Sequence, residues 1–199
     1  MEPDLIRLAQ PQRGHFDLGT GYHGDLWLDL DALFLRPALL RPYIRSLAGR
    51  LAGHKIDAVC GPAAGGAFLA QAVADLLGAA FLPAHRCLPA PGTAAGYRLP
   101  PGVRSRIGGW RVAITDDAIN AGTAARACFH QVRDSGAIPV AVAALLELGP
   151  ARAMVRDTMR VPFYAAATLP SQVWPASGCP LCADGTRPTG PVPRPEPPP

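Results

Sequence analysis

Two patterns of apolar and polar positions alternate along the chain, and they predict strands and helices in turn. Runs that are almost entirely apolar predict buried strands at 56–63, 79–88, 110–117, 138–148 and 161–169. Between them, residues 65–78 and 123–136 have the apolar spacing of helices that end at a glycine. Because strands alternate with helices, the sequence predicts an α/β fold with a mainly parallel sheet and helices on both faces.

The N-terminal segment has a different pattern. Residues 15–34 alternate apolar and polar positions around glycines, which predicts an antiparallel hairpin. Residues 36–53 have helical spacing with Pro42 as an early interruption, and residues 4–10 predict a short helix. We therefore expect a small N-terminal hood, at about 14–35, ahead of a core at about 36–170.

Two stretches lack apolar periodicity. Residues 89–109 are rich in Pro and Gly and predict a long loop, and long loops in compact domains are usually functional or mobile. The proline-rich end, 186–199, predicts a disordered tail or polyproline II segment. We expect a single domain over 1–185, in which a Cys-containing extension occupies about 171–185.

Composition and charge narrow the class of protein. Hydrophobic residues make up 49% of the 199 positions and charged residues only 17%, which suits one globular core. The net charge of +4 is mild and scattered, so it favours a small anionic ligand over nucleic acid. The sequence has no stretch typical of a membrane span or signal peptide, and its five cysteines do not suggest a secreted disulfide framework. We expect a cytoplasmic protein that binds neither nucleic acid nor membranes.

The stretch VAITDDAINAGTAARA, residues 112–127, has the pattern of a strand, a loop and a helix. Asp116 and Asp117 end the strand, where ionised carboxylates accept hydrogen bonds from vicinal hydroxyls. Small residues at a helix start let backbone N–H groups approach a phosphate. The unit therefore predicts a sugar-phosphate site with phosphate-binding residues Asn120, Ala121, Gly122, Thr123 and Ala124. The alternative is a helix cap followed by a tight turn.

A second turn, at Gly61-Pro62, ends the predicted strand at 56–63. In open α/β sheets, ligands bind beyond the carboxyl ends of the strands. We therefore expect this turn and the acid pair to line the same crevice.

ITDDAINAGTA, residues 114–124, resembles the phosphoribosyl-pyrophosphate (PRPP) signature of type I phosphoribosyltransferases. GHFDLGTGYHGDLWLD and CGPAAGGAFLAQAVADLLG resemble the N-terminal segment and the pyrophosphate-loop strand and helix of orotate phosphoribosyltransferases, in the family's order between about Gly14 and Leu169. The resemblance implies a PRPP-dependent pentosyltransferase of nucleotide metabolism, such as pyrimidine biosynthesis. It also implies Mg²⁺ as cofactor, release of pyrophosphate, and a homodimer.

The resemblance assigns roles to residues. Asp116 and Asp117 would hold the ribose hydroxyls as the catalytic acid pair. The pyrophosphate would face Gly61, Pro62, Ala63, Ala64, Gly65 and Gly66, with Arg86 and its neighbour His85 as further contacts or as a solvated edge. Trp27 of the hood would lie on the base side, where it either stacks on the base or belongs to the core.

Several positions depart from the orotate enzymes. Gly19 and Gly65 stand where those enzymes have lysines, residues 88–102 contain no lysine or histidine, and Glu147-Leu148 replaces an Asp-Arg pair. Arginine can clamp a pyrophosphate in place of lysine but does not supply acid catalysis. One alternative is therefore an impaired paralogue that binds PRPP or a nucleoside 5′-monophosphate as a regulatory protein. The other is an unrelated nucleotide-binding α/β domain.

Cys179 and Cys182 form a C-x₂-C pair near the end of the chain. This spacing is that of half a Zn²⁺ site, and a closed site needs four ligands. Cys87, His85 or a symmetry-related chain are the candidates to complete it. Without such completion the two residues are simply free thiols. A similar CPLC ending in some bacterial phosphoribosyltransferase-like proteins supports kinship more than zinc.

Overall fold

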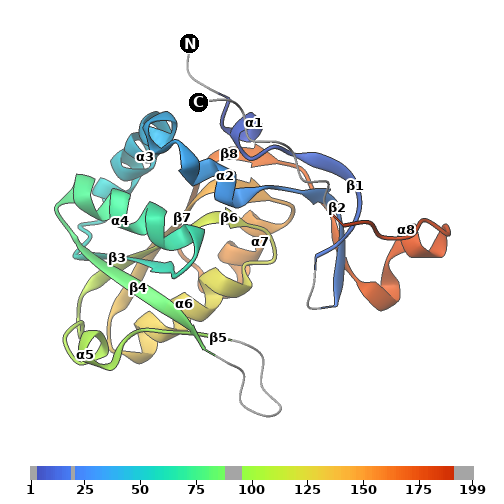
Figure 1. Ribbon diagram of the computed structural model, residues 1–199. Helices are drawn as coiled ribbons and strands as arrows, with labels where there is room; N and C mark the ends of the chain where they lie inside the picture. The colour runs from blue at the N-terminus through green and yellow to red at the C-terminus, as the bar shows by residue number, and fades with distance from the viewer. Residues whose placement is uncertain (1–3, 19–20, 88–95, 191–199) are drawn as a thin grey trace.

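A six-stranded sheet with helices on both faces forms the centre of the molecule, and a small second sheet lies to one side of it (Figure 1). The structure is a computed structural model, and it describes residues 4–18, 21–87 and 96–190. The predicted fold class, α/β with a mainly parallel sheet and a small hood, is confirmed. Within the described ranges, no helix has both the length and the apolar character needed to cross a bilayer.

The strand order of the central sheet is β5-β4-β3-β6-β7-β8. All neighbours are parallel except β5, which runs antiparallel to β4 at one edge. The strands are β3 (Ala58–Pro62), β4 (Ala80–Cys87), β5 (Gly96–Arg98), β6 (Arg111–Ile119), β7 (Ile138–Leu148) and β8 (Phe163–Leu169). The central strands β3, β6 and β7 are almost wholly buried, which explains their nearly continuous apolar sequences.

Two apolar layers cover the faces of this sheet. One face packs against α1 (Leu5–Leu8), α2 (Leu30–Leu35), α3 (Pro37–Ala52) and α4 (Gly65–Leu77). The other packs against α5 (Pro101–Arg104), α6 (Thr123–Asp134), α7 (Ala151–Met154) and the π-helical turn Val155–Met159. The site's two loops connect β3 to α4 and β6 to α6, so each side of the sheet contributes one helix to it.

The hood is a three-stranded antiparallel sheet in the order β1-β2-β9. Its strands are β1 (Gln12–Asp17), β2 (Tyr22–Trp27) and β9 (Val173–Pro175), so the C-terminal segment completes a sheet that the N-terminal hairpin begins. A 3₁₀ turn (Ala176–Gly178) and α8 (Pro180–Ala183) follow β9 beside this sheet (Figure 1).

The sequence prediction was wrong at three places. Pro42 does not interrupt its helix, because α3 runs through it and buries Leu40, Leu47 and Leu51, and this packing outweighs the cost of an interior proline. Residues 30–35, predicted within the hairpin, form α2 because the Asp29 carboxylate accepts a hydrogen bond from the Ala32 N–H at 3.1 Å.

The third error concerns residues 96–104, which were predicted within the long loop. They form β5 and α5 and bury Leu99, although the apolar spacing of this stretch predicts neither element. At the start of the predicted tail, the Thr189 N–H donates a hydrogen bond to the His15 carbonyl at 2.7 Å. The rest of the tail, 191–199, lies outside the described residues.

Candidate functional site

The carboxyl ends of β3 and β6 form the centre of the candidate site. The two strands are neighbours, but the chain leaves β3 toward β4 on one side and later enters β6 on the other. A reversal of this kind opens a crevice at the strand ends, and ligands of open α/β sheets bind there. The turns that follow the two strands flank this point.

Asp116 and Asp117 lie near the end of β6 and are only 7% and 9% exposed. Each carboxylate accepts one backbone hydrogen bond: the Asp117 N–H donates to Asp116 Oδ1 at 3.1 Å, and the Ala118 N–H donates to Asp117 Oδ1 at 2.7 Å. Among the described residues, neither acid takes part in a salt bridge. The pair is therefore buried without a cation beside it.

The surroundings of the two acids disfavour their charged forms. Burial raises the pKa of Asp116 well above its usual value, and the adjacent charge of Asp117 raises it further. Burial also raises the pKa of Asp117, although the hydrogen bond from Ala118 opposes this shift. A ligand that brings hydroxyl donors or a cation to the pair would supply the compensation that the protein itself lacks.

The turn after β3 lies directly against the acid pair. A Cβ atom on Gly65 would overlap Asp117 Oδ2, and one on Gly66 would lie 2.6 Å from Asp116 Oδ1. The turn after β3 and the acid pair are therefore in close contact at the carboxyl ends of β3 and β6. Gly61 is also sterically required, because a Cβ there would overlap the carbonyl of Gly66.

The turn at 120–124 leads into the start of α6. Gly122 is the N-cap residue at φ +67°, a backbone conformation that favours glycine. No side chain caps the helix, while Ala121 and Thr123 are exposed. The Asn120 carboxamide oxygen is buried without a partner, beside Gly149. The turn thus offers uncapped N–H groups and one hydroxyl to an anion.

The β4–β5 hairpin contributes Tyr97, which the sequence analysis missed. Tyr97 is partly buried and pairs across the hairpin with Arg86. Burial and the charge of Asp116 raise the pKa of its hydroxyl, while Arg86 lowers it. The protonated phenol is a hydrogen-bond donor within electrostatic reach of the acid pair. No sequence signal identified it, because it lies in the stretch without apolar period.

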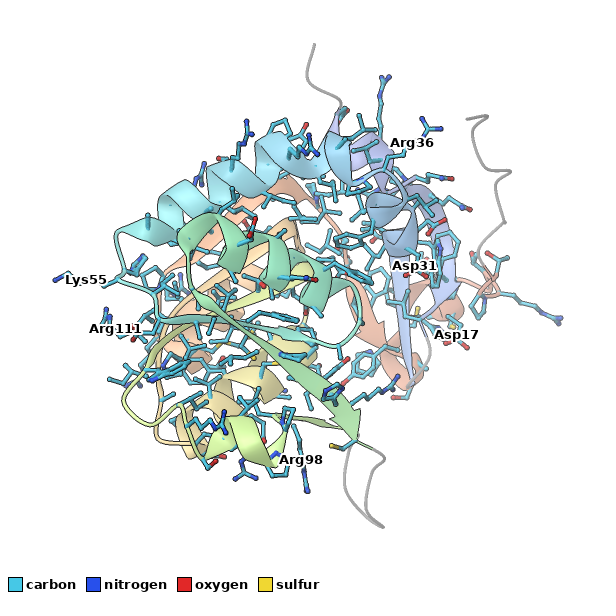
Figure 2. All side chains as sticks on the ribbon, turned by 60° about the vertical axis from the view of Figure 1, so that its left-hand side comes forward. Asp17, Asp31, Arg36, Lys55, Arg98 and Arg111 are labelled. Carbon is cyan, nitrogen blue, oxygen red and sulfur yellow. The ribbon has the colours of Figure 1, made fainter. Side chains whose placement is uncertain are left out.

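Asp31, in the first turn of α2, is the second residue that the sequence analysis missed. Its charge contributes to the raised pKa of Asp117, so it lies within electrostatic reach of the site. Figure 2 shows Asp31 on the side of the molecule toward which β4 points. Asp31 comes within electrostatic reach of Asp117 only because α2 packs over the sheet.

The described residues include only part of the region where the sequence analysis placed the base. Trp27 ends β2 and is partly buried, with its ring centroid 6.4 Å from that of Phe16. This contact is compatible with either role expected for Trp27. Gly19 lies outside the described residues. Leu148 is buried at the end of β7. The neighbouring Glu147 carboxylate accepts hydrogen bonds from the Arg152 guanidinium and Thr168 hydroxyl.

Lys55 is the single lysine of the chain, and it lies at the wrong end of the sheet to serve this site. It is exposed and precedes β3, whereas the acid pair and both turns lie at the carboxyl ends of the strands. Figure 2 shows Lys55 on the side opposite Asp31. Arg86 and Arg98 are both exposed on β4 and β5, and they are the cations nearest in sequence to residues 88–95.

Cys179 and Cys182 lie in the hood, remote in sequence from the acid pair. Their side chains face His15 of β1 and His23 of β2. Neither Cys87 nor His85, the residues proposed from the sequence to complete a metal site, belongs to this group.

Curated relatives match most of the chain. An orotate phosphoribosyltransferase of Caldanaerobacter subterraneus subsp. tengcongensis is 29% identical over 179 residues, which cover 90% of this chain and 88% of the relative. An adenine phosphoribosyltransferase of Thermobifida fusca is 36% identical over 135 residues, which cover 63% of this chain and 77% of the relative. No family model matches the chain.

Solved structures agree with these relatives. A crystal structure of adenine phosphoribosyltransferase from Rhodothermus marinus has a TM-score of 0.65 and 26% identity, covering 83% of this chain and 98% of its own. A crystal structure of orotate phosphoribosyltransferase from Aeropyrum pernix has a TM-score of 0.64 and 22% identity, covering 83% and 91%. The second of these supports the fold alone. Because these matches cover most of the chain, they exclude the alternative that the protein is an unrelated nucleotide-binding α/β domain.

Replacing Asp116 by Asn should stabilise the ligand-free protein at neutral pH. The folded-state pKa of Asp116 lies above its unfolded value, so stability falls as pH rises above the unfolded value and the folded carboxyl must ionise. Asn removes this cost and retains an oxygen for the Asp117 N–H. We expect a melting temperature about 2–4 °C higher at pH 8, the shift that ~1 kcal/mol produces in a domain of this size.

The gain should shrink as the pH falls toward 5, and differential scanning calorimetry across this range measures it. The matched control is Asp134→Asn, at an exposed carboxylate that ends α6, for which we expect no comparable gain. An equal gain in both variants, or a loss of stability in Asp116→Asn at pH 8, would contradict an uncompensated acid pair.

Proposed function

The chain belongs to the type I phosphoribosyltransferase family, and on this premise we propose that it binds PRPP and transfers its phosphoribosyl group to a nitrogenous base. One observation carries the proposal. The buried acid pair, which has no cation of its own, lies one short turn away from the uncapped start of α6. A ribose 5-phosphate has hydroxyls for the first feature and a phosphate for the second.

The sugar-phosphate contacts follow from this arrangement. Asp116 and Asp117 accept hydrogen bonds from the ribose hydroxyls. The backbone N–H groups of 121–124 and the Thr123 hydroxyl donate to the 5-phosphate, and the helix dipole of α6 adds a partial positive charge. These contacts orient C1 so that the bond to pyrophosphate breaks as the nitrogen of the base attacks, and the acid pair stabilises the positive charge that develops on the ribose.

Mg²⁺ suits the residues at this position. Asp116 and Asp117 offer only carboxylate oxygens, and hard oxygen ligands are the ones that Mg²⁺ prefers. Their position in a buried site without a paired cation gives a divalent ion the largest electrostatic benefit. When bound with PRPP, Mg²⁺ neutralises charge on the diphosphate leaving group.

The pyrophosphate side relies on backbone groups and guanidinium side chains. Gly61, Gly65 and Gly66 let the β3–α4 turn pack against itself and against the acid pair. No side chain caps α4, so its first backbone N–H groups can donate to a ligand. Arg86 is placed across from Tyr97 and provides a bidentate clamp for phosphate oxygens. A lysine at position 65 is sterically incompatible with the observed position of Asp117.

The identity of the base stays open between orotate and other pyrimidine or purine rings. Leu148 replaces the arginine that the family resemblance associates with the orotate carboxylate. The nearby guanidinium of Arg152 is already bound by Glu147 and the Phe163 carbonyl. These observations favour a base without a carboxylate. Trp27 offers an aromatic face on the hood side.

A second candidate function is binding without turnover. The observation that favours it is the position of Lys55 at the far end of the sheet, because no ammonium group is then available to protonate or hold the leaving pyrophosphate. Such a protein retains the sugar-phosphate contacts and acts as a regulatory sensor of PRPP or of a nucleoside 5′-monophosphate.

A turnover assay separates the two candidates. The protein is mixed with Mg²⁺, PRPP and a panel of bases that includes orotate, uracil and adenine, and pyrophosphate release is measured. We expect release with at least one base. Calorimetric binding of PRPP without release from any base supports the sensor, and absence of both binding and turnover contradicts both candidates.

Thr123→Val should weaken PRPP binding by about 10- to 100-fold, because a hydrogen bond to a charged group contributes ~1.5–3 kcal/mol. Titration calorimetry in the presence of Mg²⁺ measures the change. The control is Thr168→Val, an exposed threonine at the end of β8 whose hydroxyl contacts Glu147. An unchanged PRPP affinity in Thr123→Val would contradict binding of the 5-phosphate at the α6 turn.

We also propose that the chain forms a homodimer through α2, α3 and α4. Leu35, Phe68 and Leu76 are 62%, 59% and 48% exposed, and Phe68 borders an apolar groove of 610 Å³. Isolated exposed apolar residues are ordinary, but several gathered beside a groove are typical of an interface. A two-fold axis through this face would bury the same three side chains on both protomers.

Phe68→Glu should convert the dimer into a monomer, since burying one phenylalanine contributes ~1.5–3 kcal/mol and the change occurs twice in a symmetric interface. Light scattering coupled to gel filtration gives the mass. Ile138→Glu serves as control, because Ile138 is 49% exposed at the amino end of β7. A monomeric parent protein, or dimers of both variants, would contradict this interface.

A further inference from the structure

Four ligand atoms from three separate segments of the chain meet in the hood. His15 belongs to β1, His23 to β2, and Cys179 and Cys182 flank the start of α8. One ring nitrogen of each histidine and both sulfur atoms lie within 4.8 Å of one another. The acid pair and the phosphate turn contribute nothing to this group, so the inference does not depend on the proposed function.

Four of the six distances between these atoms are close to those that a tetrahedral Zn²⁺ ion imposes. With Zn–N bonds of ~2.05 Å and Zn–S bonds of ~2.3 Å, tetrahedral angles place two nitrogens about 3.4 Å apart and a nitrogen and a sulfur about 3.6 Å apart. His15 Nε2 lies 3.1 Å from His23 Nδ1 and 3.3 Å from Cys179 Sγ. Cys182 Sγ lies 3.3 Å from His23 Nδ1 and 3.8 Å from His15 Nε2.

The orientation of His15 selects Nε2 as the ligand atom. Its Nδ1 lies 2.8 Å from the Thr186 carbonyl, which can only accept a hydrogen bond, so Nδ1 carries the proton. Nε2 then has a single lone pair, and His23 Nδ1, Cys179 Sγ and Cys182 Sγ all face it. One lone pair cannot satisfy three groups by hydrogen bonding, whereas one cation satisfies all four ligand atoms together. A carbonyl behind a ligating imidazole is also the usual support of a metal site.

The burial of the four ligand residues is typical of a structural metal site rather than a catalytic one. His15, His23 and Cys179 are 4%, 8% and 3% exposed, and only Cys182 reaches the surface. Four protein ligands leave no open position for a substrate or water molecule. A set of two sulfur and two nitrogen ligands is characteristic of zinc.

We propose that His15, His23, Cys179 and Cys182 bind one Zn²⁺ ion in a closed tetrahedral site. The ligands are two neutral imidazoles and two thiolates, so the complex carries no net charge, and binding to the thiol forms releases two protons to solvent. The ion joins the N-terminal hairpin to the C-terminal segment, where β2 and β9 pair at only three residues each.

Metal analysis of the untagged full chain, purified under reducing conditions without chelator, tests the proposal directly. We expect about one zinc per chain by mass spectrometry and little of any other transition metal. Reconstitution of the chelator-stripped protein with Co²⁺ should give the visible absorption of a tetrahedral ion together with a thiolate-to-cobalt charge-transfer band. This experiment uses the parent sequence, so its outcome does not depend on whether a variant folds.

The variant Cys182→Ser removes the exposed ligand and should bind zinc at least about 100-fold more weakly. The matched control is Cys87→Ser, at a partly buried thiol of β4 outside the group, which should retain one zinc per chain. Zinc loss should also make the hood more sensitive to protease than the central sheet.

Three outcomes would overturn the proposal. The first is a reduced parent protein that contains no zinc and takes up no Co²⁺. The second is a disulfide between Cys179 and Cys182 in the purified protein, detected by peptide mass spectrometry. The third is equal zinc content in Cys182→Ser and Cys87→Ser.

Discussion

The contact between two glycines and two buried carboxylates is the constraint on which the site depends. Gly65 and Gly66 leave a space at the carboxyl end of β3, and Asp117 and Asp116 occupy it. The same contact that brings the two turns together also withdraws the acids from water and raises their pKa values. The fold therefore maintains an unfavourable arrangement of charge at the one place where a polyol or a cation relieves it.

This constraint also changes the meaning of the glycine at position 65. From the sequence alone, Gly65 stands for a missing lysine and so for a weakened leaving-group side. In the structure it is the residue that gives Asp117 its position, because any Cβ atom there meets the carboxylate. The glycine at position 65 and the inward position of Asp117 therefore depend on each other. In the proposed function, backbone N–H groups and Arg86 would then bind the pyrophosphate.

The sequence predicted what depends on local pattern. The central strands and α4 and α6 follow from apolar periodicity, and the turn between β6 and α6 follows from small residues after an acid pair. It did not predict Tyr97 or Asp31, because these side chains reach the site only through an antiparallel strand pair and through the packing of α2. Pro42 was misjudged for a related reason: tertiary burial of its helix outweighs a local preference.

The metal group shows the same limit most clearly. The C-x₂-C pair is a local signal, whereas His15 lies 164 residues before Cys179 in the chain. Sequence spacing cannot identify such a partner, and the nearest candidates, His85 and Cys87, were the wrong ones. The long separation also links the ion to folding. Because the four ligands come together only in the folded chain, the free energy of zinc binding adds to the stability of the fold. A single ion at this position would therefore stabilise the hood and, through the hood, the aromatic side of the site at Trp27.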